Sequence, residues 1–365
     1  MWRMPSPPRR LLIVRNDRVG DLMLTLPAIE AARRNWPDAY LAVLASPVAA
    51  SLLEGYPGID EIIVDRPHDT ARQLADRLRT GRFDTAVVAH TTWRNWWGVT
   101  LAGIGRKIGW GGKLPGLLLA SQRVMVSRKN PPLHEAQFVM KLMQPLGVEG
   151  NADDYEPRLH IAPELVRSIQ RDIHDRLGTE GPLFGVNPSH FRGAYNWPVH
   201  RYADLIAGLA NYGRVLVTVG PHEISVLEQI EQRWQATGAM PPERLQRVAL
   251  VSNFDLKQLA AAISLVDVFT VGNTGPMHMA GVLQTPLVAL FSTDPSQAPA
   301  RWRPLGNRRV MLLPPLPFEA DPKVAPENAE AHMCQISVAQ VIDANLMWLK
   351  WHSRNKLQTT ERQAA

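Results

Sequence analysis

Short apolar runs alternate along the chain with longer segments whose apolar residues recur every three or four positions. Runs of four to six apolar residues are typical of strands buried on both faces, and the longer segments have the period of amphipathic helices. The runs predict strands at residues 11–14, 40–45, 61–64, 85–89, 183–186, 215–219, 248–251, 268–271 and 287–291, and a further strand is placed at residues 106–109 to complete the first set. The longer segments predict helices at residues 69–80, 134–146, 164–177, 202–211, 224–235, 256–263 and 336–351, besides a helix-like run that reaches Trp36. Such alternation predicts βαβ units, and therefore an α/β fold with doubly wound parallel sheets.

A polar stretch with several prolines, residues 151–181, interrupts this alternation and indicates a connection between two domains. A length of 365 residues also favours two or three domains. We therefore predict a first Rossmann-like domain over residues 1–160 and a second over 161–335. Residues 336–365 are expected to form a terminal helix followed by a frayed polar tail.

The charge of the chain is unevenly distributed. The net charge is +6, and residues 1–130 carry 19 Lys and Arg against 11 Asp and Glu. A basic first domain predicts an anionic partner: nucleic acid, an acidic membrane surface or a phosphorylated substrate, unless it is only a solvated face. The single cysteine, Cys334, excludes an intramolecular disulfide framework, and no stretch reaches the roughly 18 apolar residues of a membrane span. We expect a soluble cytoplasmic protein.

The stretch around residues 268–281 predicts an anion site. An apolar run ends at Gly272, and a helix opens after Gly275, with Pro276 suited to its first turn. Backbone N–H groups and the positive end of the helix dipole converge there, beyond the carboxyl end of a strand. His278, one turn into the helix, can donate to a phosphate. The alternative is an ordinary strand–turn–helix junction.

The end of the first predicted strand carries a candidate base. Asp21 opens a helix, where the dipole favours negative charge, and a carboxylate there can accept a proton from a hydroxyl. The alternative is a simple capping residue, and Asp17 is the competing carboxylate. Arg15 and Arg18 flank both carboxylates, so they either bind an anionic substrate or pair with the carboxylates.

The second domain offers further candidates at the ends of its strands. Ser189, His190 and Arg192 follow one strand and could donate to a diphosphate, or could form a polar loop. Glu223 follows the next strand and could accept the hydroxyls of a ribose, or could open its helix. Together with the helix start after residue 272, these residues supply what a nucleotide diphosphate requires.

Several other chemistries lack their motifs. The sequence has no G-x-G-x-x-G after the first strand, no P-loop, no G-x-S-x-G elbow and no cluster with metal-ligand spacing. We therefore expect no metal and no cofactor, and no recognition motif supports nucleic-acid binding. The cluster of Trp93, Trp96 and Trp97 is interpreted as interior packing in preference to sugar stacking or membrane contact.

Four segments together resemble glycosyltransferase family 9, the ADP-heptose:lipopolysaccharide heptosyltransferases. They are residues 13–28, 197–202, 220–223 and 272–278. The resemblance implies a GT-B fold of two Rossmann-like domains facing a central cleft. It implies inverting, metal-independent transfer of a heptose from a nucleotide-sugar donor to a phosphorylated glycolipid, the lipopolysaccharide inner core. The site of action would be the cytoplasmic face of the inner membrane, with peripheral contact to it.

The resemblance also assigns roles to residues. Asp21 is then the catalytic base, Arg15 and Arg18 meet the acidic groups of the acceptor, and Glu223 holds the ribose. The expected donor-binding set is Ser189, His190, Arg192, Glu223, Asn273, Thr274, Gly275 and His278.

Two positions depart from the family pattern, both on the donor side. Tyr195 stands where the family has a lysine two residues before Trp-Pro, with Arg192 the nearest substitute, and Asn273 stands where it has aspartate. A different sugar donor or surface-glycan acceptor therefore stays open as an alternative. A second alternative is a nucleotide-sugar-binding protein without catalysis.

Overall fold

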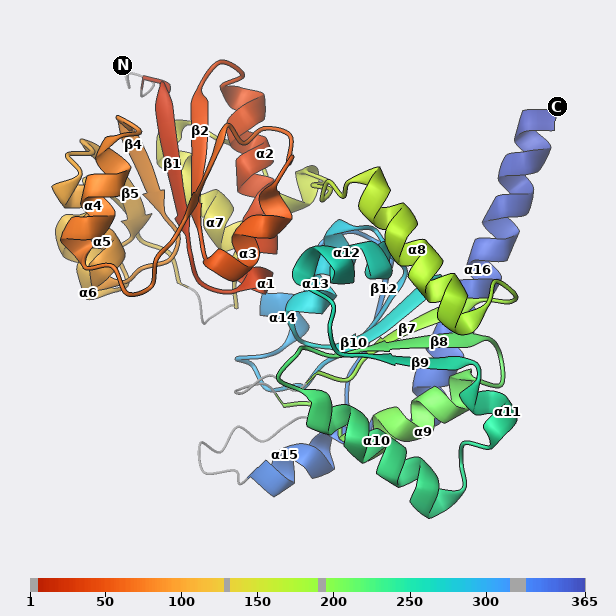
Figure 1. Ribbon diagram of the computed structural model, residues 1–365. Helices are drawn as coiled ribbons and strands as arrows, with labels where there is room; N and C mark the ends of the chain where they lie inside the picture. The colour runs from red at the N-terminus through yellow and green to blue at the C-terminus, as the bar shows by residue number, and fades with distance from the viewer. Residues whose placement is uncertain (1–5, 128–131, 190–194, 316–325, 365) are drawn as a thin grey trace. The chain divides into compact units, whose positions relative to one another are not determined.

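The computed structural model describes residues 6–127, 132–189, 195–315 and 326–364. His190 and Arg192, two of the expected donor-binding residues, lie outside these ranges. The chain forms two compact units, Met1–His160 (unit 1) and Ile161–Ala365 (unit 2). Each contains a six-stranded sheet in which all neighbouring strands are parallel, so the predicted α/β fold with doubly wound sheets is confirmed (Figure 1).

The sheet of unit 1 has the strand order β3-β2-β1-β4-β5-β6. Its central strand is buried on both faces, since Leu11, Leu12, Ile13 and Val14 are fully buried. The strands are β1 (Arg10–Arg15), β2 (Tyr40–Ala45), β3 (Glu61–Val64), β4 (Thr85–Val88), β5 (Arg106–Trp110) and β6 (Gln122–Val124).

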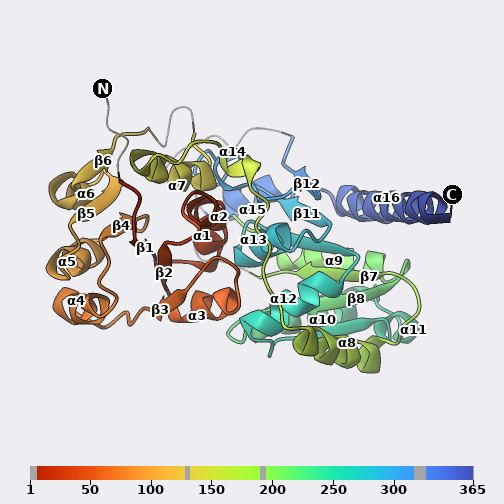
Figure 2. The same ribbon diagram turned by 90° about the horizontal axis from the view of Figure 1, so that it is seen from above.

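Helices cover both faces of this sheet. Helices α4 and α5 pack against each other on one face, and α2 and α7 pack against each other on the other face (Figure 2). Leu74 of α4 and Trp96 of α5 belong to the apolar core beneath them. The helices of unit 1 are α1 (Val19–Met23), α2 (Leu26–Asn35), α3 (Pro47–Ala50), α4 (Ala71–Arg79), α5 (Trp93–Leu101), α6 (Leu114–Leu119) and α7 (Glu135–Met143).

Unit 2 repeats the architecture with the strand order β12-β11-β10-β7-β8-β9. Its strands are β7 (Leu183–Asn187), β8 (Arg214–Thr218), β9 (Val248–Val251), β10 (Val268–Gly272), β11 (Leu287–Leu290) and β12 (Arg309–Leu312). Its helices are α8 (Pro163–Leu177), α9 (Val199–Leu209), α10 (Ile224–Thr237), α11 (Pro242–Leu245), α12 (Leu256–Leu265), α13 (Gly275–Val282), α14 (Pro299–Trp302), α15 (Pro326–Met333) and α16 (Val338–Ala364).

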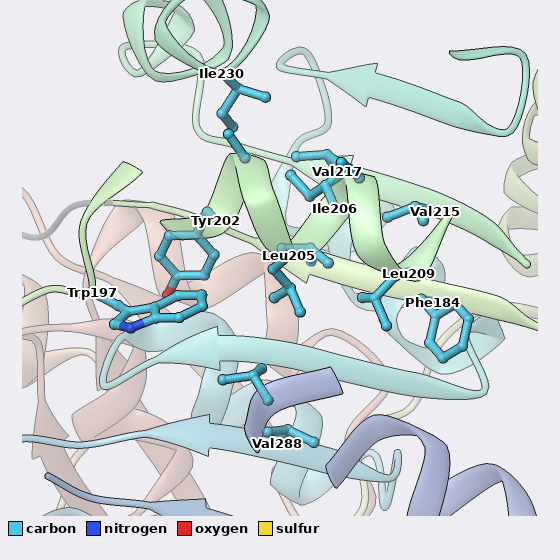
Figure 3. Close-up of a cluster of buried hydrophobic side chains, with 14 of the residues drawn as sticks. Phe184, Trp197, Tyr202, Leu205, Ile206, Leu209, Val215, Val217, Ile230 and Val288 are labelled. Atoms are coloured by element: carbon cyan, nitrogen blue, oxygen red, sulfur yellow. The ribbon is translucent and has the colours of Figure 1, made fainter. Parts of the chain in front are cut away.

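The core of unit 2 includes the start of the terminal helix (Figure 3). Trp197 lies edge-on to Tyr202, with ring centroids 4.9 Å apart, and its Nε1 donates to the Ile336 carbonyl at 3.0 Å. Trp348 of α16 donates to the Leu287 carbonyl at 3.3 Å. Helix α16 therefore packs on unit 2, and it continues to Ala364, where the sequence predicted a frayed tail.

The predicted helix-like run reaching Trp36 is divided in the structure. Helix α1 ends at Met23, and α2 begins at Leu26. Pro27 lies in the first turn of α2, where its missing N–H costs no hydrogen bond. In the middle of one continuous helix the same proline would remove a backbone hydrogen bond, so the chain divides into two helices. The division leaves Asp21 on a short helix of its own.

The topology marks one place in each sheet. Counted from the first strand of each unit, the order is 3-2-1-4-5-6 in both sheets, so the winding direction reverses between β1 and β4 and between β7 and β10. Open α/β sheets bind ligands beyond the carboxyl ends of their strands at such a reversal. No helix in the described ranges is both long and apolar enough to cross a membrane.

Candidate active site

In unit 1, a buried arginine gathers three carboxylates at the end of β1. The Arg15 side chain is only 2% exposed. Its Nη2 donates to Oδ1 of Asp21 and, at 3.1 Å, to Oε1 of Glu135, which lies in the first turn of α7. Its Nε lies 3.1 Å from Oδ1 of Asp17. Of the two roles open to Arg15, the structure shows ion pairing, and little of its surface is left for an acceptor.

The charges of this cluster shift its pKa values. Burial alone lowers the pKa of Arg15, but Asp17, Asp21 and Glu135 together raise it above the ordinary value. Burial raises the pKa of Asp17 to about 6; Arg15 opposes this effect and Asp21 adds to it. Three acids share one guanidinium, so the least well paired carboxylate keeps its proton to a higher pH.

The carboxylate of Asp21 is held in place and accessible. Its Oδ1 is bonded to Arg15, while its Oδ2 accepts no hydrogen bond from the described residues, and 14% of the side chain is exposed. The backbone carbonyl of Asp21 accepts a hydrogen bond from the hydroxyl of Thr25 at 2.9 Å, which ties α1 to the start of α2. Arg18, just before α1, is exposed. These positions suit a base that receives a hydroxyl from solvent.

A second polar network borders this cluster, and the sequence analysis did not single it out. Nδ2 of Asn16 donates to Asp65 at 2.7 Å, and Oδ1 of Asn16 accepts from Asn95 at 2.8 Å. Asp65, which is 3% exposed, accepts hydrogen bonds from both terminal nitrogens of Arg94, at 2.8 and 3.0 Å. The signal for it was available: Asn16, Asp65 and His90 each follow a predicted strand within two residues, at the sheet edge where ligands bind.

The geometry of this network fixes the tautomer of His90. Nδ1 of His90 lies 2.8 Å from Oδ1 of Asn16, an oxygen that can only accept, so Nδ1 carries the proton. Burial, together with the positive charges of Arg15 and Lys113, lowers the pKa of His90 to about 4. The ring is therefore neutral near pH 7, and its Nε2 is a hydrogen-bond acceptor.

In unit 2, the stretch predicted to bind an anion forms the junction of β10 and α13. Thr274 is in extended conformation before the helix, and Pro276 occupies the first turn. The side chain of Thr274 does not cap the helix by accepting a hydrogen bond, and residues 272–278 contain no acidic residue. Thr274 and His278 are buried. The junction therefore presents backbone donors and the positive end of an eight-residue helix to one place.

The other predicted donor-side residues lie after β7 and β8. Ser189 is half-buried two residues beyond the end of β7. Glu223 precedes α10, and its Oε2 accepts from the Gly220 N–H at 3.0 Å. The carboxylate thus shapes the turn between β8 and α10. Its expected contact with a ribose stays a prediction.

The two departures from the family pattern meet at one residue, Gln297, in the loop after β11. Its Oε1 accepts from the backbone N–H of Tyr195 at 2.7 Å. Its backbone carbonyl accepts from Nδ2 of Asn273 at 3.0 Å. Gln297 therefore links the segment after β7 to the end of β10. Neither contact follows from spacing, because Gln297 is 102 residues from Tyr195.

The tryptophan cluster is only partly interior, contrary to the sequence interpretation. Trp96 is fully buried against the sheet, whereas Trp93 and Trp97 are 46% and 43% exposed. In the described ranges, no group of three or more His, Cys, Asp or Glu is arranged to hold a metal ion.

Known proteins resemble the chain over most of its length. The family model described as glycosyltransferase family 9 (heptosyltransferase) matches residues 71–333. Lipopolysaccharide heptosyltransferase 2 of Escherichia coli is 26% identical over 83% of this chain and 88% of its own length.

Solved structures share the fold. The structure of E. coli ADP-heptose lipopolysaccharide heptosyltransferase II has a TM-score of 0.77 at 20% identity and covers 94% of this chain and 99% of its own. A family 9 glycosyltransferase from Veillonella parvula has a TM-score of 0.76 at 21% identity, covering 93% and 97%. Both support the GT-B assignment of the two Rossmann-like units. The chain belongs to glycosyltransferase family 9 and is a heptosyltransferase-family enzyme.

Proposed function

We propose that the protein transfers a heptose from ADP-heptose to the phosphorylated inner core of lipopolysaccharide, with inversion at the anomeric carbon and without a metal ion. The family and the relatives support heptosyl transfer. The nucleotide, the stereochemistry and the acceptor are inferred from the resemblance. The observation that carries the proposal is the position of Asp21, a carboxylate held by buried Arg15 beyond the end of β1, at the reversal point of the sheet.

In the proposed reaction, Asp21 takes the proton of an acceptor hydroxyl. The hydroxyl oxygen forms a bond to the anomeric carbon from the face opposite the nucleotide, and the bond from that carbon to the diphosphate breaks. The electron pair of the broken bond leaves with ADP. Arg15 orients Oδ1 of Asp21, so that Oδ2 faces the incoming hydroxyl.

On the donor side, the start of α13 would hold the diphosphate. The backbone N–H of Gly275 and the helix dipole favour an anion, and more so as negative charge grows on the leaving group. Thr274, His278, Ser189 and Asn273 would complete the phosphate contacts, and Glu223 would hold the ribose.

On the acceptor side, Arg18 is the exposed cation next to Asp21 and would meet an acidic group of the inner core. The neutral ring of His90 would accept a hydrogen bond from an acceptor hydroxyl through Nε2. A cytoplasmic enzyme that contacts the inner membrane peripherally would meet such a lipid-linked substrate.

The base is tested by two matched variants, because Asp17 and Asp21 contact the same arginine. Asp21→Asn is expected to lower kcat about 10²- to 10⁴-fold with ADP-heptose and inner-core acceptor, since removal of a positioned base has effects of this order. Asp17→Asn should keep turnover within about tenfold. Loss of turnover in Asp17→Asn together with near-normal turnover in Asp21→Asn would reverse the assignment.

The substrates are tested by a donor screen. ADP-heptose, other ADP-sugars and UDP-sugars are each incubated with protein and a deacylated inner-core saccharide, and product is followed by mass spectrometry. Product from ADP-heptose alone supports the proposal. Product from another donor would favour a family 9 enzyme for a different sugar, and tight binding of a donor without nucleotide release would favour a protein without catalysis.

A further inference from the structure

Unit 1 exposes seven large apolar side chains on α5, α6 and the segment after β6. We call this set the α5–α6 face. Its members are exposed by 40% to 71%, whereas most large apolar residues of unit 1 are buried. They are Trp93, Trp97, Leu101, Leu114, Leu117, Leu118 and Met125.

The spacing of these residues places them on one side of each helix. On α5 the exposed residues recur every four positions, while Trp96 and Val99 between them are buried against the sheet. On α6, Leu114, Leu117 and Leu118 have the same helical spacing. Helices α5 and α6 contact each other and lie on the same side of unit 1 (Figures 1 and 2). Large apolar side chains that are exposed together, in contrast to single ones, are candidates for an interaction site.

The charge around this face has one sign. Residues 85–134 contain seven Lys and Arg and no Asp or Glu. Lys113, immediately before α6, and Arg123, in the middle of β6, are both exposed. A partner for this surface must therefore offer an apolar layer together with negative charge. An anionic lipid bilayer has both, and tryptophan and leucine beside basic residues are the side chains that bind its interface.

We infer that the α5–α6 face docks unit 1 onto an anionic membrane surface. The face begins at the rim of the acceptor side, because Trp93 adjoins Arg94 and Asn95, which belong to the network around Asn16. A docked unit 1 would bring that rim to the headgroup layer, where a lipid-linked saccharide is anchored. The benefit of docking for catalysis rests on the proposed function, but the binding of the protein to lipid can be measured independently of that function.

The apolar part is tested by co-sedimentation of the full-length protein with vesicles of phosphatidylglycerol and phosphatidylcholine, and with vesicles of phosphatidylcholine alone. Wild type should bind the mixed vesicles at least tenfold more strongly. Leu114→Gln/Leu118→Gln should weaken that binding about tenfold or more, because two leucines of 58% and 59% exposure lose their apolar insertion. The control Tyr212→Gln/Leu245→Gln alters two residues of unit 2 that are 50% and 48% exposed and should change nothing.

The basic part is tested in the same assay. Lys113→Gln/Arg123→Gln should weaken binding to mixed vesicles about tenfold and make that binding less dependent on salt. Each cation near an anionic surface strengthens the binding on the order of a few-fold. The control Arg158→Gln/Arg171→Gln removes two exposed cations elsewhere and should bind like wild type. Equal binding of all variants, or no binding of wild type, overturns the inference.

Two further measurements separate the remaining explanations. Sedimentation without lipid tests whether the face instead joins two copies: a wild-type dimer that becomes monomeric in Leu114→Gln/Leu118→Gln, with unchanged vesicle binding, would contradict docking to lipid. Turnover with a soluble, deacylated acceptor should be unaffected in this variant, while turnover with acceptor in vesicles should fall. A protein that binds vesicles but transfers no heptose would refute only the proposed function.

Discussion

The carboxyl edges of the two sheets have the same topology but opposite electrostatics. At the edge of unit 1, charged groups are already paired: Arg15 holds three carboxylates, and Asp65 holds Arg94. At the edge of unit 2, residues 272–278 carry no acidic side chain, and a helix starts there with Gly275 at its first position. One edge therefore contains an excess of negative charge around a buried cation, and the other edge favours an anion.

This difference suits the two tasks proposed for one strand order, removal of a proton at unit 1 and binding of a diphosphate at unit 2. The proposed base must be fixed in direction and reachable, and Asp21, partly exposed and paired with a buried guanidinium, meets both conditions. A diphosphate site must attract negative charge without a competing carboxylate, which backbone donors achieve. The strand order places both edges where ligands bind, and the side chains after each strand decide what binds there.

The largest effect is expected from removing the cation of unit 1. Arg15→Met should destabilise unit 1 by about 3–5 kcal/mol, because buried Glu135 and its neighbouring acids then lose the cation that they share. Urea unfolding followed by circular dichroism measures this change. The control Arg176→Met breaks an exposed pair with Asp172 and should cost at most about 1 kcal/mol.

Adding Glu135→Gln to Arg15→Met should restore part of the lost stability, because one buried charge is then neutral. A loss in Arg15→Met no larger than in the control would show that the acids of unit 1 do not depend on the buried guanidinium. The comparison between the two edges would then be wrong for unit 1.

The sequence predicted the strands well because buried parallel strands are nearly continuous apolar runs. The strands it missed, β6 and β12, lie at the edges of the sheets and are only partly buried. The residues of β6, QRV, contain no apolar run, whereas β12 lies in a short apolar run, residues 310–313, that was not assigned. Helix α5 was noticed only as a tryptophan cluster. Its two apolar sides, one packed and one exposed, conceal the usual amphipathic pattern.

The site was predicted as positions more than as contacts. Asp21 and the start of α13 could be singled out because strand ends followed by helix starts have local signals. Glu135 was missed, since 120 residues separate it from Arg15 and nothing local links the two. For the same reason the sequence could name both roles of Arg15 but could not choose between them.

An intermediate effect, dependent on pH, is expected at Asp17. Its pKa rises from an ordinary value of 3.8 to about 6 on folding, so the folded state binds this proton more tightly. The unfolding free energy should therefore fall as the pH rises from about 4 to about 6, by about 1–3 kcal/mol from this group. Asp17→Asn lacks the titration, so its stability relative to wild type should increase over that range and stay constant above pH 7.

Urea unfolding of both proteins at pH 4, 5, 6 and 7.5 measures the difference. Asp60→Asn, at an exposed ion pair with Arg33, is the control, and its difference from wild type should not rise with pH. A difference for Asp17→Asn that is flat with pH, or that falls, would mean that the cluster of unit 1 accommodates its third carboxylate without strain.

The smallest effect should come from the edge of unit 2, where neutral hydrogen bonds hold the loop after β11 in place. Gln297→Ala removes the bond to the Tyr195 N–H but keeps the backbone bond to Asn273, and Asn273→Ala does the reverse. One neutral bond contributes about 0.5–1.5 kcal/mol, so each variant should weaken ADP binding about 3- to 10-fold in calorimetry. Gln229→Ala, exposed on α10, is the control.

The double variant Gln297→Ala/Asn273→Ala tests whether the two hydrogen bonds of Gln297 act together. If they do, it should lose less ADP affinity than the sum of the two single losses, because either single change already releases the loop after β11. Additive losses would instead mean that Tyr195 and Asn273 affect donor binding separately. Unchanged ADP affinity in both single variants and the double variant would show that the start of α13 holds ADP without help from Gln297.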